Sequence, residues 1–273
     1  MPGRLRNFGL RRWLVVGALS LVAVFTLSAI VAYSLAEQAP TWWRTVRLDD
    51  PRTQQTAIAI ENGLWNAVFE RREPGHERWH VWMSASDANA WLNTTLRDWV
   101  AAEWDLVGWP EDLREVQVEF MDGSIAIGLR VRTPEGERYV SAVVEPIIDA
   151  DGALWLPART VSLGRLTLPA GVLLEYLRRN RERYLPEALL TLPETESMFR
   201  ALEGRAPLVE RASQSLGDGR RVRLIAMRPV GARLELWCVT SPDDTGKDDD
   251  RLQRVRAQSP AAIASQGTAE GPG

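Results

Sequence analysis

An uncharged stretch near the N-terminus, Trp13–Leu35, constrains the fold of this chain more than any other feature. As a helix rising about 1.5 Å per residue it covers about 34 Å, and the hydrocarbon core of a bilayer is about 30 Å thick. Trp13 and Tyr33 lie near its two ends, where aromatic side chains favour the membrane interface. The sequence therefore predicts a transmembrane helix over residues 13–36, with the lipid bilayer as its partner.

Four arginines precede this stretch, and their side chains set the predicted orientation. Residues 1–12 contain no acidic residue, and the bases are Arg4, Arg6, Arg11 and Arg12. Basic flanks stay on the cytoplasmic side of a membrane. We expect a single-pass protein of the cell membrane, with a cytoplasmic segment 1–12 and an extracytoplasmic domain.

Two export signals are alternatives to an uncleaved anchor. Ser34 and Ala36 form a small-x-small pattern that a signal peptidase could cut, and Arg11-Arg12 fits a twin-arginine signal. The apolar stretch is longer than the 7–15 residues typical of a signal peptide, which favours the anchor. All of these interpretations place the remaining residues outside the cytoplasm.

Charge and cysteine content exclude several classes of function. The chain has 273 residues and a net charge of −3, which gives no general attraction for nucleic acid. Cys238 is the one cysteine, so neither an intrachain disulfide nor a site with several cysteine ligands can form. Cys238 lies in an alternating run, "RLELWCVT", and is predicted to be a buried thiol.

The exterior part divides into three predicted segments. Residues 37–75 are expected to be a juxtamembrane segment with one helix beginning near Pro51, and its Trp42 and Trp43 suit a membrane interface. Residues 76–240 are expected to form the folded domain. Residues 241–273, which begin "SPDDTGKDDD", carry no apolar period and are predicted to be a disordered tail.

Periodicity within 76–240 predicts an α+β fold. Ser84 and Asp87 fit a capping box, and the apolar residues that follow recur at helical spacing. From residue 113 the period changes to two, with turns such as Asp122-Gly123 between short strands. We expect the transmembrane helix to be followed by one curved antiparallel sheet, a meander plus a C-terminal hairpin near Pro229, covered by amphipathic helices.

Segments in this order resemble the YpmS-like proteins. The similarity covers roughly residues 80–240 and is carried by "SASDANAWLNTTL", "DGSIAIGLRVR", "VVEPIIDADGALWLPARTVSLGRLTLP" and "VLLEYL". The resemblance implies a single-span protein with an extracytoplasmic α+β domain. It implies no reaction and no catalytic residue, and the many tryptophans and the long tail depart from that family.

One pattern is typical of zinc peptidases. "HERWH" places His76, Glu77 and His80 in the H-E-x-x-H order, which on a helix would put both imidazoles on one face. Pro74-Gly75 precedes it, however, and "WHVWM" alternates as a strand does. We expect the two histidines to bind no metal, and a zinc peptidase is the weakest alternative.

Other catalytic patterns are missing from the sequence. It contains no G-x-S-x-G, no P-loop and no G-x-G-x-x-G. The acidic residues Asp122, Asp149 and Asp151 lie in predicted hairpin turns, where Asp is common for backbone reasons. We expect a protein that is not an enzyme and uses no cofactor.

A hydrophobic ligand site is the leading functional hypothesis. Amphipathic helices on an antiparallel sheet can leave an apolar groove, and the candidate lining residues are Trp91, Leu92, Trp99, Leu163, Leu166, Leu173, Tyr176 and Leu177. The alternative is that these side chains are core, since aromatic residues dominate core burial. We expect the protein to bind or carry a lipid-like envelope component; the alternative is a membrane-surface scaffold for envelope proteins.

The corner "VSLGRLTLP" was expected to be architectural. Gly164 is predicted to permit a bulge or a close approach of another segment, and Pro169 to begin the next helix. Gly164→Val is expected to harm folding, while Arg165→Ala is expected to leave it largely intact.

Overall fold

The computed structural model describes residues 6–70, 72, 78–96, 109–133, 135–184, 190 and 193–243, except for the side chains of 6–19, 183, 184, 193 and 194. Its helices are α1 (Arg6–Glu37), α2 (Pro51–Phe69), α3 (Ala85–Asn93), α5 (Ala170–Arg179), α6 (Arg181–Tyr184) and α8 (Pro193–Leu202). Its strands are β1 (Arg78–Ser84), β2 (Leu113–Met121), β3 (Ser124–Thr133), β4 (Gly136–Val144), β5 (Ile147–Ile148), β6 (Leu154–Trp155), β7 (Ala158–Leu163), β8 (Leu166–Pro169), β9 (Ser213–Ser215), β10 (Arg220–Val230) and β11 (Arg233–Pro242).

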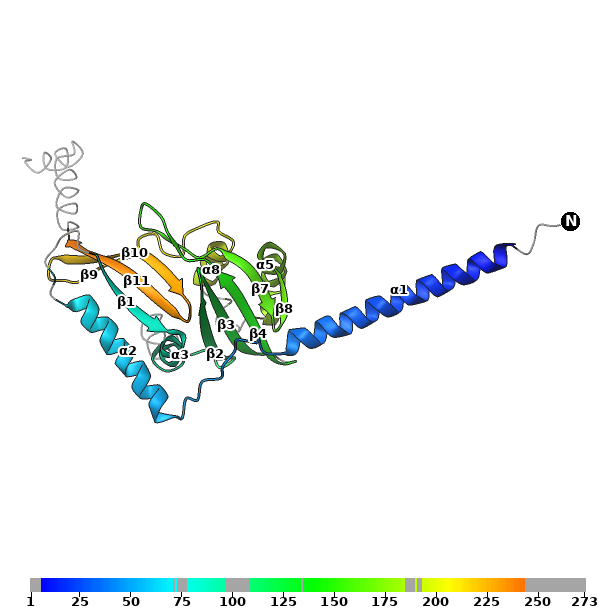
Figure 1. The fold of residues 1–273 in the computed structure, drawn as a ribbon, viewed down its shortest axis with the longest axis horizontal. Coiled ribbons are helices and arrows are strands. Elements are labelled where there is room, and N and C mark those ends of the chain that lie inside the picture. Colours follow the sequence, from blue (N-terminus) through cyan, green and yellow to red (C-terminus); the bar gives the residue numbers. More distant parts are fainter. Residues whose placement is uncertain are drawn as a thin grey trace, which may run out of the picture.

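These elements make an α+β fold with antiparallel sheets, as the periodicity predicts. A five-stranded sheet has the order β2-β3-β4-β7-β8, a four-stranded sheet has the order β1-β11-β10-β9, and β5 pairs with β6 (Figure 1). The prediction that the meander and the C-terminal hairpin form one sheet is therefore wrong. The hairpin β10–β11 does not extend the meander, because β1 pairs with β11 along its whole length, from Arg78↔Val239 to Ser84↔Arg233.

A shared core joins the two sheets. Phe120, Ile125 and Val144 of the five-stranded sheet form a buried cluster with Leu234 of the four-stranded sheet and with Ala88 of α3. Ser84 and Asp87 make the predicted capping box that begins α3. The helix is thus fixed where strand β1 ends, and its small residues let both sheets approach it.

The helix after Pro169 packs on the opposite end of the meander. Leu173, Leu174 and Leu177 of α5 are buried with Val161 of β7 and Phe199 of α8. Leucines spaced three and four residues apart share one face of a helix, so α5 contributes one continuous apolar stripe. The curvature of the sheets and their covering by amphipathic helices stay predictions.

Cys238 lies on the inner face of the four-stranded sheet. It is buried with Trp79 and Val222, and Ala67 and Val68 of α2 pack against this cluster. Burial raises the pKa of the Cys238 thiol to about 11, so it stays protonated at neutral pH. The structure confirms the prediction of a buried thiol.

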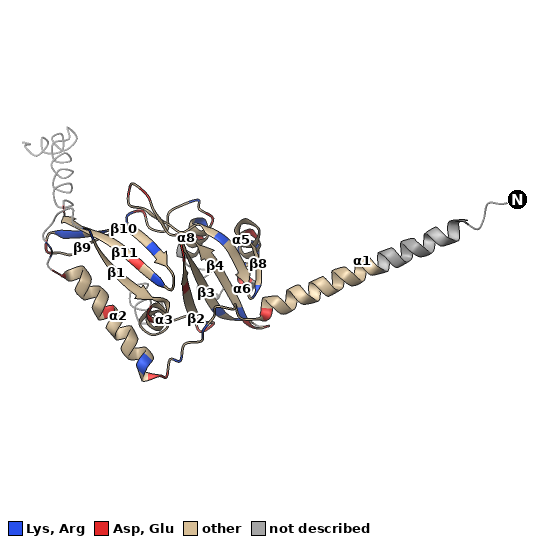
Figure 2. Ribbon diagram, in the orientation of Figure 1, with Lys and Arg blue, Asp and Glu red and all other residues tan. Residues whose placement is uncertain are grey.

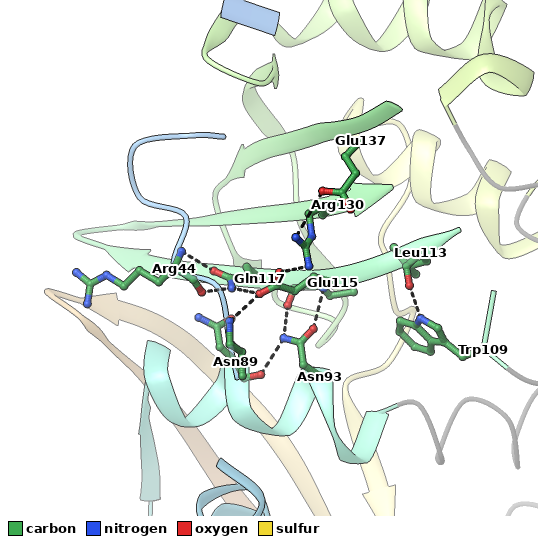
Figure 3. A network of polar contacts seen from close by, with 11 residues as sticks. Arg44, Asn89, Asn93, Trp109, Leu113, Glu115, Gln117, Arg130 and Glu137 are labelled. Atoms are coloured by element: carbon green, nitrogen blue, oxygen red, sulfur yellow. Dashed lines mark hydrogen bonds and ion pairs between the residues drawn. The ribbon is translucent and has the colours of Figure 1, made fainter. Parts of the chain in front are cut away.

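The outer edge of β2 is closed by two asparagines of α3 (Figure 3). The Asn89 side chain donates to the Val118 carbonyl at 2.9 Å and accepts from the Val118 N–H at 2.7 Å. Asn93 makes the same pair of bonds with Val116, at 2.6 and 3.0 Å. Because Asn carries both a donor and an acceptor, these two amides substitute for a neighbouring strand.

The segment after α1 crosses the five-stranded sheet. Trp42 and Trp43 lie over Gly128, where an added Cβ would come within 2.9 and 2.8 Å of their rings. The Gln117 amide accepts from the Arg44 N–H at 3.0 Å and donates to the Arg44 carbonyl, and Glu115 accepts from the Val46 N–H (Figure 3). Both tryptophans therefore pack on the domain. The sequence suggested a place at the membrane interface and did not indicate this packing.

Helix α1 ends directly on the turn between β7 and β8. The Arg165 N–H donates to the Leu35 carbonyl at 2.8 Å, and Arg165 Nε donates to the Ala39 carbonyl at 3.0 Å. Gly164 has a φ of +57°, and an added Cβ would lie 2.5–2.6 Å from the carbonyl oxygens of Leu35, Ala36 and Gln38. The structure confirms that Gly164 permits a close approach.

An ion pair adds a second contact at the same place. Arg138 Nη1 lies 2.8 Å from Glu37 Oε1, and Arg138 Nη2 lies 3.3 Å from Glu135 Oε2. The hydrogen bond to Glu37 raises the pKa of the Arg138 guanidinium above its usual value. The end of α1 is thus held by backbone and side-chain bonds together.

The second half of α1 is apolar and is not buried by the rest of the chain. Its window Ser20–Glu37 has a mean hydropathy of 1.7, long and apolar enough to cross a membrane, and none of it is buried by the rest of the chain. Large side chains such as Leu21 and Phe25 are about three-quarters exposed, at 73% and 76%. Figure 1 shows α1 extending away from the domain.

Gly164→Ala is expected to destabilise the full chain in detergent and to lower its Tm well below that of Gly231→Ala. Both glycines have left-handed φ values, +57° and +54°, so both substitutions carry a backbone cost of about 1–2 kcal/mol. An added Cβ at Gly231 meets open space, whereas at Gly164 it meets three carbonyls. Equal Tm losses, measured by circular dichroism, would show that the contact with α1 contributes nothing.

Asn93→Ala is expected to destabilise the domain by about 2–3 kcal/mol, because it leaves buried Val116 backbone groups without partners. Asn93 is 2% exposed. Urea unfolding gives the free energy, and Asn62→Ala on the exposed face of α2 is the control. A loss below about 0.5 kcal/mol, typical of surface substitutions, would contradict the role assigned to the Asn93 amide.

Candidate functional site

The two faces of the four-stranded sheet differ in chemistry. Side chains alternate between faces along a strand. Trp79, Cys238 and Leu224 occupy one register position and point into the core, so the next position, Arg78↔Val239↔Arg223, lies on the outer face. The outer face of this sheet is therefore basic and aromatic where the inner face is apolar.

A hollow of about 570 Å³ lies on this outer face. It is lined by Arg78, Arg223, Ile225, Ala226, Arg228, Trp237 and Val239, from strands β1, β10 and β11. The register of β10 against β11 shifts between Leu224 and Ala226, which marks a bulge in the floor of the hollow. A bulge bends its strand locally and re-aims the neighbouring side chains. Basic positions recur along β10 (Figure 2).

The three arginines of the hollow outnumber the acidic residue beside them, Glu235, which pairs in register with Arg228. Within the described part of the chain, Arg78, Arg223 and Arg228 make no ion pair, whereas Arg138 and Arg221 do. Like charges gathered in one concavity focus a positive potential and attract anions. A guanidinium also presents a planar fork of donors that matches a carboxylate or a phosphate.

One wall of the hollow is aromatic. The His80 ring stacks on Trp237 with centroids 4.6 Å apart, and the Arg228 guanidinium lies 5.8 Å from the Trp237 ring centre. Glu235 accepts a hydrogen bond from Trp237 Nε1 at 3.2 Å, which fixes the orientation of the indole. The hollow thus offers a rigid apolar surface beside three cationic groups.

The arginines that line the hollow can bind an anion. Arginine stays protonated and does not serve as a base. Among the described residues, no group of three or more His, Cys, Asp and Glu side chains is placed to hold a metal ion. The chemistry of the site is therefore recognition of negative charge next to an apolar surface.

The histidines of "HERWH" do not lie on a described helix. His80 is exposed on strand β1, and it stacks on Trp237 instead of facing a second imidazole. His76 and Glu77 lie outside the described residues. The strand expectation for this segment is confirmed, and the helical spacing that a zinc site of this kind needs is not met at His80.

The turn aspartates have the backbone roles that were predicted. Asp149 Oδ1 accepts from the N–H groups of Asp151 and Ala153 at 3.0 and 2.9 Å, and Oδ2 accepts from Trp155 Nε1 at 2.9 Å. The Trp155 bond, followed by the backbone bonds, lowers the Asp149 pKa. Asp122 accepts from the Gly231 N–H at 2.6 Å, joining the turns of the two sheets.

The predicted groove residues of the β7–α5 corner lie close together. Leu163 packs against the cluster that contains Leu173 and Leu177, which are 2% and 6% exposed. Leu166 is half-buried on β8, and Tyr176 is 41% exposed on α5. The two buried leucines of α5 therefore serve the core.

The remaining groove candidates lie elsewhere. Leu92 packs on a separate cluster of Leu113, Val116 and Val131, and Trp91 is half-buried on α3. Trp99 lies outside the described residues. None of the seven candidates that the structure describes lines the basic hollow.

Apolar periodicity does not identify the residues of the hollow, because its arginines occupy the polar positions of their strands. In "RRVRLIAMR" the bases Arg221 and Arg223 alternate with apolar residues, and "RWHVW" alternates Arg78 and His80 with Trp79 and Val81. Period-two patterning with basic and aromatic residues on one face indicates a charged sheet surface. That signal was available in the sequence.

Comparison of the chain with family models and with curated proteins finds no match. The resemblance to the YpmS-like proteins stays a prediction.

Proposed function

We propose that this protein is a membrane-anchored scaffold of the cell envelope, and that its exterior domain binds an acidic segment of a partner protein in the basic hollow. The observation that carries the proposal is the set of three arginines around Trp237, which make no ion pair with any residue that the structure describes. The hollow presents charge for carboxylates and an indole surface for the apolar part of a peptide.

Helix α1 supports the anchoring part of the proposal. It is long and apolar enough to cross a membrane, and its last residues bond to the β7–β8 turn and to Arg138. Cleavage after Ala36 would remove the Leu35 carbonyl, which accepts from the Arg165 N–H, and the Ala36 carbonyl, which lies against Gly164. The contacts therefore support an uncleaved anchor over a signal peptide. The arginines of residues 1–12 favour a cytoplasmic N-terminus.

The position of the hollow favours a partner that approaches from outside the bilayer. Helix α1 contacts β4, β7 and β8 of the five-stranded sheet. Figure 1 places the four-stranded sheet at the opposite end of the domain. The hollow on β1, β10 and β11 is thus presented away from the anchor, where another envelope protein can reach it.

The length of the hollow suits an extended peptide. Arg223 and Arg228 pair with Val239 and Glu235, which are four residues apart on β11, so they are separated along the sheet by about 13 Å at about 3.3 Å per residue, and Arg78 lies across β11 from Arg223. Acidic side chains along an extended segment would meet these cations in turn. The hypothesis of a lipid-like ligand stays a prediction, as does the expectation that the protein is not an enzyme.

Arg223→Gln/Arg228→Gln is expected to weaken binding of an acidic peptide by about tenfold or more, since each charge-assisted hydrogen bond contributes about 1.5–3 kcal/mol. The probe is a fluorescein-labelled peptide of about ten residues rich in Asp, which is long enough to span the hollow. Binding is measured by anisotropy to the full chain in zwitterionic nanodiscs.

Arg52→Gln, on the exposed first turn of α2, is the matched control and is expected to leave the affinity unchanged. Anionic phospholipid vesicles and an anionic polysaccharide serve as competitors. Absence of peptide binding, or equal affinities for the two arginine variants, would refute the proposal. Stronger competition by vesicles than by unlabelled peptide would assign the hollow to lipid headgroups and also overturn it.

A further inference from the structure

We propose that the exterior domain rests on the bilayer through a second surface, the outer flank of α5, in addition to its anchor α1. This flank consists of Val172, Tyr176 and Arg179. Its partner is the headgroup region of the membrane that α1 crosses. The inference rests on the anchoring part of the proposed function and is independent of the basic hollow.

The end of α1 holds the domain at the level where this helix leaves the bilayer. The uncharged stretch Trp13–Leu35 covers about 34 Å as a helix, which matches a hydrocarbon core of about 30 Å, so its last residues lie at the interface. The Arg165 N–H donates to the Leu35 carbonyl at 2.8 Å. The β7–β8 turn is therefore held at the membrane surface.

Helix α5 lies next to this turn. Strand β8 follows the turn and ends at Pro169, and α5 begins at the next residue, Ala170. Both α1 and α5 contact β7 and β8. Figure 1 shows β8 and α5 at the end of the domain from which α1 extends. Helix α5 therefore lies on the membrane side of the domain.

The outer flank of α5 faces away from α8. Arg178 marks the side of α5 that faces α8, because its Nη2 lies 3.4 Å from Oε1 of Glu196 on that helix. At about 100° per residue, Val172, Tyr176 and Arg179 share a flank that is about 100° or more around the helix axis from Arg178. Figure 1 places α8 on the side of α5 that is farther from α1. The outer flank is thus turned toward the membrane.

The composition of this flank suits a membrane interface. Val172 is 62% exposed and Tyr176 is 41% exposed, although both lie on a helix whose opposite face is core. Arg179 is exposed at the end of the flank and pairs with Glu175 at 2.8 Å, and Arg165 is exposed on the adjacent turn. Tyrosine rings and long arginine side chains are typical of the headgroup level, where the apolar part enters the bilayer and the polar end stays in water.

Two contacts with the bilayer constrain the domain more than one does. A single helix leaves its domain free to rotate about the helix axis, and helices tilt by about 20° on average. Contact through α5 fixes which side of the domain meets the lipid. The four-stranded sheet, at the opposite end of the domain, is then held away from the membrane (Figure 1).

Fluorescence quenching by lipid is expected to be several-fold stronger at position 172 than at position 214, because apolar side chains of interfacial helices lie about 5–10 Å into the headgroup boundary. The full chain is labelled with bimane at V172C, at Q214C on exposed β9, or at I30C on the exposed apolar part of α1. Buried Cys238 stays unlabelled. The nanodiscs contain phosphatidylcholine and a lipid with an acyl-chain nitroxide near the headgroup.

The label at position 30 separates failure of the inference from failure of the anchor. Strong quenching at position 30 with weak quenching at 172 and 214 would show an anchored domain held clear of the bilayer and overturn the inference alone. Weak quenching at all three positions would refute the anchor and the inference together. Equal, strong quenching at 172 and 214 would show unspecific lipid contact and also overturn the inference.

V172D/Y176D is expected to reduce the quenching of a label at T167C, on the exposed part of β8, by several-fold, since charged side chains are unfavourable at the apolar boundary. I58D/W65D is the matched control, because it introduces the same charges at residues of α2 that are 57% and 52% exposed. Circular dichroism checks that both variants are folded. Unchanged quenching in V172D/Y176D, or an equal loss in both variants, would contradict the assigned contact.

Discussion

The contact between the end of α1 and the β7–β8 turn fixes how the rest of the structure is presented. The last carbonyls of a helix have no partners within the helix. Here the Leu35 carbonyl accepts from the Arg165 N–H, and Gly164 leaves room for three neighbouring carbonyls. Arg138 neutralises Glu37 beside them. The end of the apolar helix is thus bonded directly to the five-stranded sheet.

The two sheets make different contacts. The five-stranded sheet receives α1 on its β4–β8 side and the segment of Trp42 and Trp43 across Gly128. The four-stranded sheet uses its inner face for the shared core and leaves its outer face to Arg78, Arg223 and Trp237. Core packing between the sheets makes them one body, so the anchor determines where the basic hollow points.

Local signals in the sequence predicted the local structure well. The capping box at Ser84, the hairpin turn at Asp122 and the helix start at Pro169 need only neighbouring residues, and each is confirmed. The pairing of β1 with β11 was missed because it joins segments far apart in the chain. The amides of Asn89 and Asn93 were missed because a polar residue on a helix reveals its partner strand only after folding. The site arginines were missed because an alternating strand pattern identifies the buried apolar face and says little about the role of the opposite face.

A distance measurement across the molecule tests the central claim, that α1 and the four-stranded sheet form one rigid unit. Spin labels would be placed on cysteines introduced at exposed Ile30 of α1 and Gln214 of β9, in full chain held in nanodiscs. Cys238, buried with a pKa of about 11, stays unlabelled. Electron–electron double resonance is predicted to give one narrow distance distribution. A broad distribution extending to short distances would show a flexibly tethered domain and contradict the account.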